Sequence, residues 1–258
     1  MRAFFIPYSG KMYIIRTYLF YKMNKFLFIL SIFSLNAFTT NLDTKNSLIE
    51  FYGKSNTKIN IVIKDNIDIQ GKVTSAGSLA LEKNIASKNA FIIQKLIDAD
   101  FHIAGKANLS EWANFRSEDS VSGWSSYGGQ TKHFLNAEYN PCGSSSGSAV
   151  AVAIGVVDIA IGTETNGSIS CPSSVNAIVG FKPTVGLVSR SGIVPISSTQ
   201  DTAGPMGKSV ALVAKTLQVI AGYDPLDPAT QNIPDDLDLN FSKDLENSSI
   251  AGKRFAIL

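Results

Sequence analysis

Ile59-Asn-Ile-Val-Ile63 is short, rich in β-branched residues and followed by polar Lys64-Asp-Asn66, a pattern that predicts a buried strand. Ser87 is a suitable N-cap for a helix that extends to about Ala99, because apolar residues recur at helical spacing within that segment. Phe101-His-Ile-Ala104 then predicts another strand. These segments together form a strand–helix–strand unit.

The same alternation continues further along the chain. Residues 149–154 are small and apolar and predict a closely packed helix, and residues 156–161 predict a strand. Ser209 can cap a further helix over residues 210–221, which Gly222 ends. Alternating strands and helices predict an α/β fold, with a mixed sheet inside an α/β/α layer arrangement. The polar run over residues 108–140 is long for a connection inside a domain, and loops of that length are usually functional.

The first 40 residues differ from the rest in charge. They hold five basic residues and no acidic one, whereas residues 41–258 hold 18 basic and 21 acidic side chains, so the net charge of +2 belongs to this leader. Lys22 and Lys25 precede an apolar run of about ten residues that ends near the small residue Ala37, which is the order of a secretory signal. We therefore expect residues 23–37 to be a signal peptide and residues 41–258 to be the folded part.

The predicted signal implies export to the periplasm or the cell exterior. The alternatives are a cytoplasmic protein whose apolar N-terminal helix packs on the domain, or a start codon placed too early. The apolar run is too short for a comfortable membrane span, so we expect no stable one. The mildly acidic body lacks the basic footprint of a nucleic-acid-binding protein.

Cysteine and histidine usage argues against a metal centre. Cys142 and Cys171 are too few for a disulfide scaffold, although they allow one bridge in an exported protein. His102 and His133 lie in apolar surroundings with no ligand neighbour at a recognisable spacing, so we expect structural histidines and no metal site.

Serine chemistry is the remaining catalytic option, and three versions can be compared. Residues 143–148 lack the lysine of a phosphate-binding loop. Residues 143–147 match the G-x-S-x-G elbow of α/β-hydrolases, but that fold needs a histidine after the nucleophile and none follows His133. The third version pairs a serine with a lysine base, and the lysine side chain must be unprotonated for part of the time to accept a proton. Lys64 at the end of a buried strand could be desolvated in that way, or it could be an ordinary solvated residue.

Three motifs occur in order along the chain: Lys64-Asp-Asn-Ile67, Asn140-Pro-Cys-Gly-Ser-Ser-Ser-Gly-Ser148 and Thr163-Glu-Thr-Asn-Gly-Ser-Ile169. Their order and content resemble the amidase signature family of serine amidohydrolases. The similarity spans roughly residues 58–222 and includes Gly105-Lys-Ala-Asn-Leu-Ser-Glu-Trp112 and Asp201-Thr-Ala-Gly-Pro-Met206.

The resemblance implies a Ser–cis-Ser–Lys relay that hydrolyses a carbon–nitrogen amide bond of a small molecule, without a cofactor. Ser168 takes the place of the nucleophile, Ser144 that of the bridging serine, held through a cis peptide bond, and Lys64 that of the base. Ser145 is expected to help position Lys64. The resemblance also implies an oxyanion hole built from the backbone N–H groups of Thr165, Asn166, Gly167 and Ser168.

Some positions depart from the family pattern. Asn166 and Ser146 stand where many members have glycine, and Ser170 stands where the subunits of glutamyl-tRNA(Gln) amidotransferase in this family usually have arginine. The last departure favours a stand-alone amidase over such an amidotransferase component. The family domain is nearly twice as long, and residues 253–258 predict a strand without a partner, so we expect a fold that is incomplete at its C-terminus. Two alternatives to an active, incomplete amidase domain are an inactive remnant of an amidase and a complete sheet into which the C-terminal strand docks.

Overall fold

The computed structural model describes residues 5–8, 11–14, 43–243, 245 and 249–254. The chain divides into two units, residues 1–42 and residues 43–258. In the first unit, β1 (Phe5–Tyr8) and β2 (Lys11–Ile14) pair as an antiparallel hairpin. The predicted signal peptide, residues 23–37, lies outside the described residues. Among the described residues, no helix has the length and apolar character needed to cross a membrane.

A six-stranded sheet forms the centre of the second unit. Its strands run in the order β3 (Leu48–Phe51), β5 (His102–Ala107), β4 (Asn60–Lys64), β8 (Ile159–Glu164), β10 (Thr202–Gly207) and β9 (Val179–Gly180). The central strand β4 is parallel to both of its neighbours, and the remaining pairs are antiparallel. The predicted mixed sheet is therefore confirmed.

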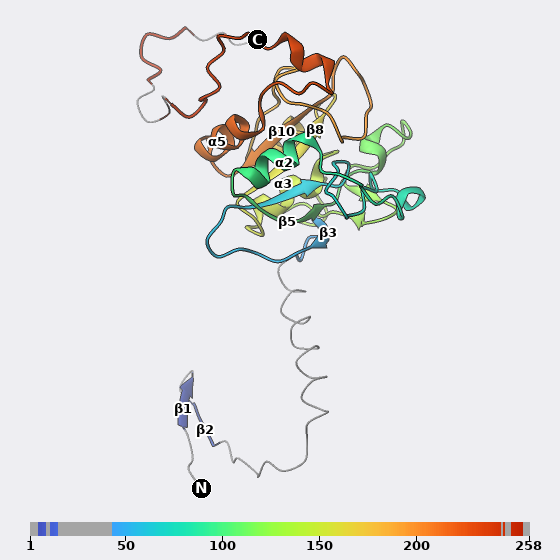
Figure 1. Ribbon diagram of the computed structural model, residues 1–258. Coiled ribbons are helices and arrows are strands. Elements are labelled where there is room, and N and C mark those ends of the chain that lie inside the picture. The colour runs from blue at the N-terminus through green and yellow to red at the C-terminus, as the bar shows by residue number, and fades with distance from the viewer. Residues whose placement is uncertain (1–4, 9–10, 15–42, 244, 246–248, 255–258) are drawn as a thin grey trace. The chain divides into compact units, whose positions relative to one another are not determined.

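Helices cover both faces of this sheet. α2 (Phe91–Asp98) and α5 (Val210–Ile220) lie side by side and share one apolar core with the isoleucines of β4 and β8 (Figure 1). α3 (Ser146–Ala153) packs on the opposite face, against Val62, Ala160 and Met206, and α4 (Ser170–Val175) lies next to it. The alternating faces of the strands thus produce the predicted α/β/α layers.

Five short elements lie within the connections. They are the 3₁₀ turns η1 (Leu79–Leu81), η2 (Glu111–Asn114) and η3 (Pro228–Asn232) and the two-residue strands β6 (Trp124–Ser125) and β7 (Gly129–Gln130). β6, β7 and η2 fall inside the long polar run over residues 108–140, whose other residues form turns, bends and irregular loops.

The N-cap prediction for the first helix is wrong. α2 begins at Phe91, and the residue before it, Ala90, is extended and makes no side-chain cap. The chain ahead of the helix is bound to a neighbouring loop instead: the N–H of Ala90 donates to the carbonyl of Asp68, and Asn89 accepts from the N–H of Gln70. Ser87 therefore lies four residues before the first residue of the helix.

Other boundaries are closer to expectation. Ser209 caps α5 by accepting from the N–H of Leu212 at 3.3 Å, and Gly222 after it has a positive φ of 128°, as predicted for a glycine that ends a helix. β8 begins at Ile159 rather than at residue 156, and α3 begins three residues before Ala149. Lys253 and Arg254 are not in a strand, and the rest of the predicted C-terminal strand lies outside the described residues.

Candidate active site

The candidate site lies where two parallel strands end. Lys64 is the last residue of β4, and Glu164 is the last residue of the neighbouring β8. Because β10 runs antiparallel to β8, with Thr202 opposite Glu164, Asp201 reaches the same edge. The carboxyl edge of parallel strands is a common place for ligand sites in α/β proteins.

Lys64 is fully buried at this edge and has three hydrogen bonds. Its Nζ donates to Ser144 Oγ at 2.7 Å, to Thr163 Oγ1 at 2.9 Å and to the Thr163 carbonyl at 3.2 Å. Burial lowers the pKa of Lys64 to about 7, although the charges of Glu164 and Asp201 act in the opposite direction. A large part of the Lys64 population is therefore neutral near neutral pH.

Ser144 and Ser145 lie on the segment that leads into α3. The Gly143–Ser144 peptide bond is cis, as the resemblance implied, and the Ser144 carbonyl accepts from the N–H of Ser110 at 3.0 Å. Among the described residues, Ser145 makes no hydrogen bond with Lys64. Its Oγ donates to the Thr163 carbonyl at 3.1 Å and accepts from the Thr163 N–H at 3.2 Å, so it supports Lys64 only through Thr163.

Ser168 lies in the turn between β8 and α4. The residue is 8% exposed, and its carbonyl accepts from the N–H of Ser145 at 3.1 Å. Among the described residues, its hydroxyl makes no hydrogen bond, so the structure contains the Lys64–Ser144 contact but no Ser144–Ser168 hydrogen bond. Gly167 before it has a positive φ of 82°, a conformation that side chains disfavour.

The backbone of this turn presents free donors. Within the part of the chain that the structure describes, the N–H groups of Asn166 and Ser168 donate to no group, and Asn166 is exposed. Thr165 is fixed differently: its hydroxyl donates to Asp201 Oδ1 at 2.6 Å, while the other oxygen of Asp201 accepts from two backbone N–H groups. The four residues predicted for the oxyanion hole thus form one turn that includes the free N–H groups of Asn166 and Ser168.

Glu164 is a site residue that the sequence did not reveal. Its Oε2 accepts from the N–H groups of Ile169 at 2.7 Å and Ser170 at 2.8 Å. Burial would raise the pKa of Glu164, but hydrogen bonds from the backbone of Ser170, Ile169 and Gly167 lower it more strongly. The ionised carboxylate therefore closes the turn that carries Ser168.

Thr163 is a second residue that sequence reasoning missed. It binds Lys64 through two oxygens and accepts from Asn66 Nδ2 at 3.0 Å. Its carbonyl oxygen also accepts a hydrogen bond from Ser145 Oγ. The only signal in the sequence was its place at the start of the third motif, where a threonine is equally typical of a strand.

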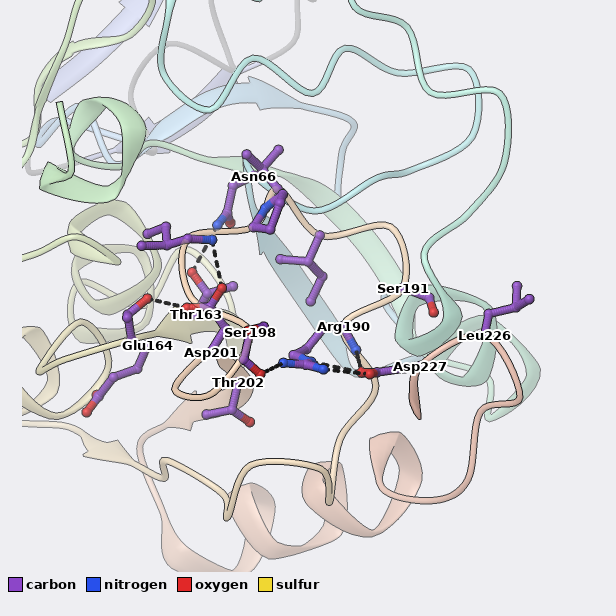
Figure 2. A pocket seen from close by; sticks show the side chains of 15 residues that line it. Asn66, Thr163, Glu164, Arg190, Ser191, Ser198, Asp201, Thr202, Leu226 and Asp227 are labelled. Carbon is purple, nitrogen blue, oxygen red and sulfur yellow. Dashed lines mark hydrogen bonds and ion pairs between the residues drawn. The ribbon is translucent and has the colours of Figure 1, made fainter. Parts of the chain in front are cut away.

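A cavity of about 260 Å³ opens beside these residues. Figure 2 shows Asn66, Thr163 and Glu164 at one end of it and the Arg190–Asp227 pair at the other. Arg190 donates to Asp227 through Nε at 2.9 Å and Nη2 at 2.7 Å. A second cavity of about 220 Å³ shares four lining residues with the first, namely Asn66, Val194, Pro195 and Ile196. The two cavities therefore leave room, beside Asn66 and Thr163, for a molecule larger than a single amide group.

Cysteines and histidines have structural contacts. Cys142 and Cys171 form a disulfide with a Cα–Cα distance of 6.0 Å. His102 Nε2 and His133 Nε2 each lie 2.9 Å from a backbone carbonyl oxygen, of Gly53 and Val175 respectively, which agrees with the structural role expected for both. The described part of the chain contains no cluster of three or more side chains suited to hold a metal ion.

The fold and the site together define an α/β/α protein with a lysine–serine cluster at the edge of a mixed sheet. The family model described as Amidase matches residues 52–256, so the chain belongs to the amidase family. A probable amidase of Arabidopsis thaliana is 43% identical over 200 residues, covering 77% of this chain and 39% of the relative. A glutamyl-tRNA(Gln) amidotransferase subunit from Methanosarcina acetivorans is 42% identical over 167 residues, covering 65% of this chain and 34% of the relative.

Solved structures give the same family. The peptide amidase of Stenotrophomonas maltophilia matches with a TM-score of 0.73 and 46% identity, over 80% of this chain and 46% of that one. A glutamyl-tRNA(Gln) amidotransferase subunit from Thermotoga maritima matches with a TM-score of 0.66 and 34% identity, over 80% and 46%. The predicted amidase signature fold is confirmed, and the chain spans less than half the length of these relatives.

Proposed function

We propose that this protein hydrolyses a carbon–nitrogen amide bond outside the peptide backbone, with Ser168 as nucleophile, Ser144 as proton relay and Lys64 as base. The observation that carries the proposal is the buried Lys64 amino group, 2.7 Å from Ser144 Oγ, with its pKa lowered to about 7 by burial. A lysine can act as a base only while it is neutral, and this environment supplies that form near neutral pH.

The proposed reaction begins with attack of Ser168 Oγ on the amide carbonyl. The Ser168 proton passes to Ser144 Oγ as Ser144 gives its own proton to neutral Lys64 Nζ. Lys64 then returns a proton through Ser144 to the leaving amine, the carbon–nitrogen bond breaks, and an ester of Ser168 remains. Water hydrolyses this acyl-enzyme in the second half of the reaction and restores the serine hydroxyl.

The turn before α4 would stabilise the negative charge on the carbonyl oxygen. The N–H groups of Asn166 and Ser168 donate to no group among the described residues, so they can receive an oxyanion. Thr165 and Gly167 complete the predicted oxyanion hole by shaping the turn, through the Asp201 contact and the positive φ respectively. Loss of one such donor costs an enzyme about 3 kcal/mol of transition-state stabilisation.

The proposed substrate is a small-molecule amide. The cavity of about 260 Å³ beside Thr163 is the size of a small organic molecule, and one relative of known structure is named a peptide amidase. Serine, lysine and backbone N–H groups supply every role of the proposed reaction, so it needs no cofactor.

A fluorophosphonate probe tests the proposal, because it reacts with activated serine nucleophiles and needs no knowledge of the substrate. We expect the full chain to be labelled once, at Ser168, and Ser168→Ala to abolish labelling. Ser174→Ala is a matched control, because Ser174 is an exposed serine of α4 that makes no contact with the site. Labelling that persists in Ser168→Ala, or none in the parent chain, would refute the assignment.

We also propose that the leader directs export. The Cys142–Cys171 disulfide supports this, since disulfides persist mainly in oxidising compartments. Expression with the intact leader, followed by N-terminal sequencing of the secreted chain, should find a new N-terminus near Ala37. An uncleaved chain retained in the cytoplasm would favour the alternative location.

A further inference from the structure

The disulfide joins the two segments that carry the serines of the proposed relay. Cys142 lies two residues before Ser144, and Cys171 lies three residues after Ser168. Both cysteines are half-buried, and their Cα atoms are 6.0 Å apart. The bridge therefore connects the segment leading into α3 with the first turn of α4, beside the candidate site.

Each cysteine is hydrogen-bonded to the backbone segment that carries the neighbouring serine of the proposed relay. The N–H of Cys171 donates to the Gly167 carbonyl at 2.9 Å, which fixes Cys171 to the turn that presents Ser168. On the other side, Ser146 Oγ donates to the Cys142 carbonyl at 2.5 Å, which fixes Cys142 to the segment of Ser144. A shift of either cysteine would move the adjacent serine.

Few other contacts join the two segments directly. The N–H of Ser145 donates to the Ser168 carbonyl at 3.1 Å, and Asn176 Nδ2 donates to the carbonyls of Pro141 at 2.9 Å and Pro172 at 2.8 Å. Within the described part of the chain, no hydrogen bond links the side chains of Ser144 and Ser168. The separation of the two hydroxyl groups is therefore set by how the two backbone segments are held together.

We propose that the Cys142–Cys171 disulfide is a positioning element that holds the segment of Ser168 against the segment of Ser144, so that the reactivity of Ser168 requires the oxidised protein. This inference rests on the proposed function. Misplacement of a reacting group by about 1 Å can lower a rate about 100-fold, so a modest separation of the two segments is sufficient.

Reduction of the bridge is a defined two-electron reaction. One molecule of dithiothreitol gives two electrons and two protons, so that the sulfur–sulfur bond breaks, two cysteine thiols form and the reagent becomes a cyclic disulfide. The contacts between Lys64 and Thr163 join β4 to β8 and do not involve the two segments that the bridge links, so we expect them to survive reduction.

The test compares the oxidised full chain, the same chain reduced by dithiothreitol, and the double variant Cys142→Ser/Cys171→Ser. The rate of fluorophosphonate labelling reports the reactivity of Ser168. Hydrogen exchange of residues 140–148 and 165–172 reports how firmly the two segments are held, independently of any reaction. Thermal unfolding shows whether each form is folded at the assay temperature.

We expect reduction to lower the labelling rate at least 10-fold and to speed exchange in both segments, with β4 and β8 still protected and unfolding still cooperative. Reoxidation should restore the rate, whereas the double variant should react slowly with or without reductant. The pH midpoint of labelling should stay near that of the oxidised protein, because Lys64 keeps its burial and its two contacts with Thr163 even where its contact with Ser144 loosens.

Unchanged labelling together with unchanged exchange would overturn the positioning role while leaving the proposed function intact. A rate loss that only accompanies global unfolding would also overturn it. If no form is labelled, the proposed function fails, and the positioning role fails with it; faster exchange in the two segments would then show only that the bridge holds them together.

Discussion

Lys64 is buried and hydrogen-bonded to Ser144, and its protonation state controls the proposed reaction. Its pKa of about 7 arises from desolvation, so the neutral base becomes available as pH rises through that value. We expect the rate of fluorophosphonate labelling to increase about tenfold per pH unit below 7 and to level off above it. Lys64→Arg should be nearly unreactive at every pH, since a guanidinium group stays protonated. A flat profile between pH 5 and 9 would contradict the assignment of Lys64 as base.

The same lysine makes stability depend on pH. Its pKa is near 10.5 in the unfolded chain and about 7 in the folded protein, so between these values the unfolded state binds more protons. The contribution of Lys64 to the free energy of unfolding therefore rises with pH from 7 to about 10.5 and is least favourable below 7. Lys64→Met should accordingly gain most stability below pH 7. Urea unfolding at pH 6 and pH 9 measures the difference, and an equal effect at both would disprove it.

Thr163 binds Lys64 through its hydroxyl and its carbonyl oxygen. Its hydroxyl accepts from both Lys64 and Asn66, and a hydrogen-bond acceptor favours the protonated amine. Thr163→Val removes the acceptor without changing the size of the side chain much, so we expect the pH midpoint of labelling to move below that of the parent. Thr163→Ser retains the hydroxyl and should keep the midpoint. A midpoint that is the same in all three proteins would mean that Thr163 is only a packing residue.

At the scale of elements, a buried ion pair holds the end of β4. Lys106 Nζ on β5 lies 3.0 Å from Asp65 Oδ1, both side chains are 1% exposed, and Lys106 also donates to the Ile67 carbonyl at 2.7 Å. Burial raises the pKa of Asp65 and lowers that of Lys106, while their attraction opposes both shifts. The pair thus fixes the strand end directly after Lys64.

Removal of one partner of this pair should be costly. We expect Lys106→Met to lower the free energy of unfolding by about 3–5 kcal/mol, because it leaves the Asp65 carboxylate buried without its partner. Lys58→Met is the matched control, since Lys58 pairs with Asp100 on the surface, where an ion pair contributes less than about 1 kcal/mol. Urea denaturation measures the free energy of unfolding of both variants. Similar losses of stability in the two would show that the buried Asp65–Lys106 pair contributes no more than a surface ion pair.

Some secondary-structure elements could be predicted from the sequence and others could not. β4 was recognisable because apolar β-branched residues and the polar Lys64 share one short segment, and α5 because Ser209 and Gly222 mark its ends. The start of α2 was not recognisable, because Asn89 and Ala90 are bound by a loop, at Gln70 and Asp68, that lies about 20 residues earlier in the chain. Local signals predict local hydrogen bonds well, but tertiary contacts can override them.

The same limit applies to the candidate site. Motif resemblance pointed to Lys64 and Ser144, which the structure brings into contact, and to Ser168, but it did not predict that Ser145 binds Thr163 or that Glu164 binds the turn before α4. Those contacts depend on the register between β4 and β8 and on the direction of β10, which no local pattern encodes.

At the scale of the whole molecule, the site and both apolar cores described above belong to residues 43–258. A chain that begins at Asn41 should therefore unfold at the same temperature as the full chain, within about 2 °C, and react with a fluorophosphonate at the same rate. The comparison requires both proteins to carry the Cys142–Cys171 disulfide, so both are purified under oxidising conditions and assayed for free thiols first. A large loss of stability or reactivity on removal of the first 40 residues would show that this leader supports the fold, as an apolar N-terminal helix packed on the domain would, and would argue against its role as a cleaved signal.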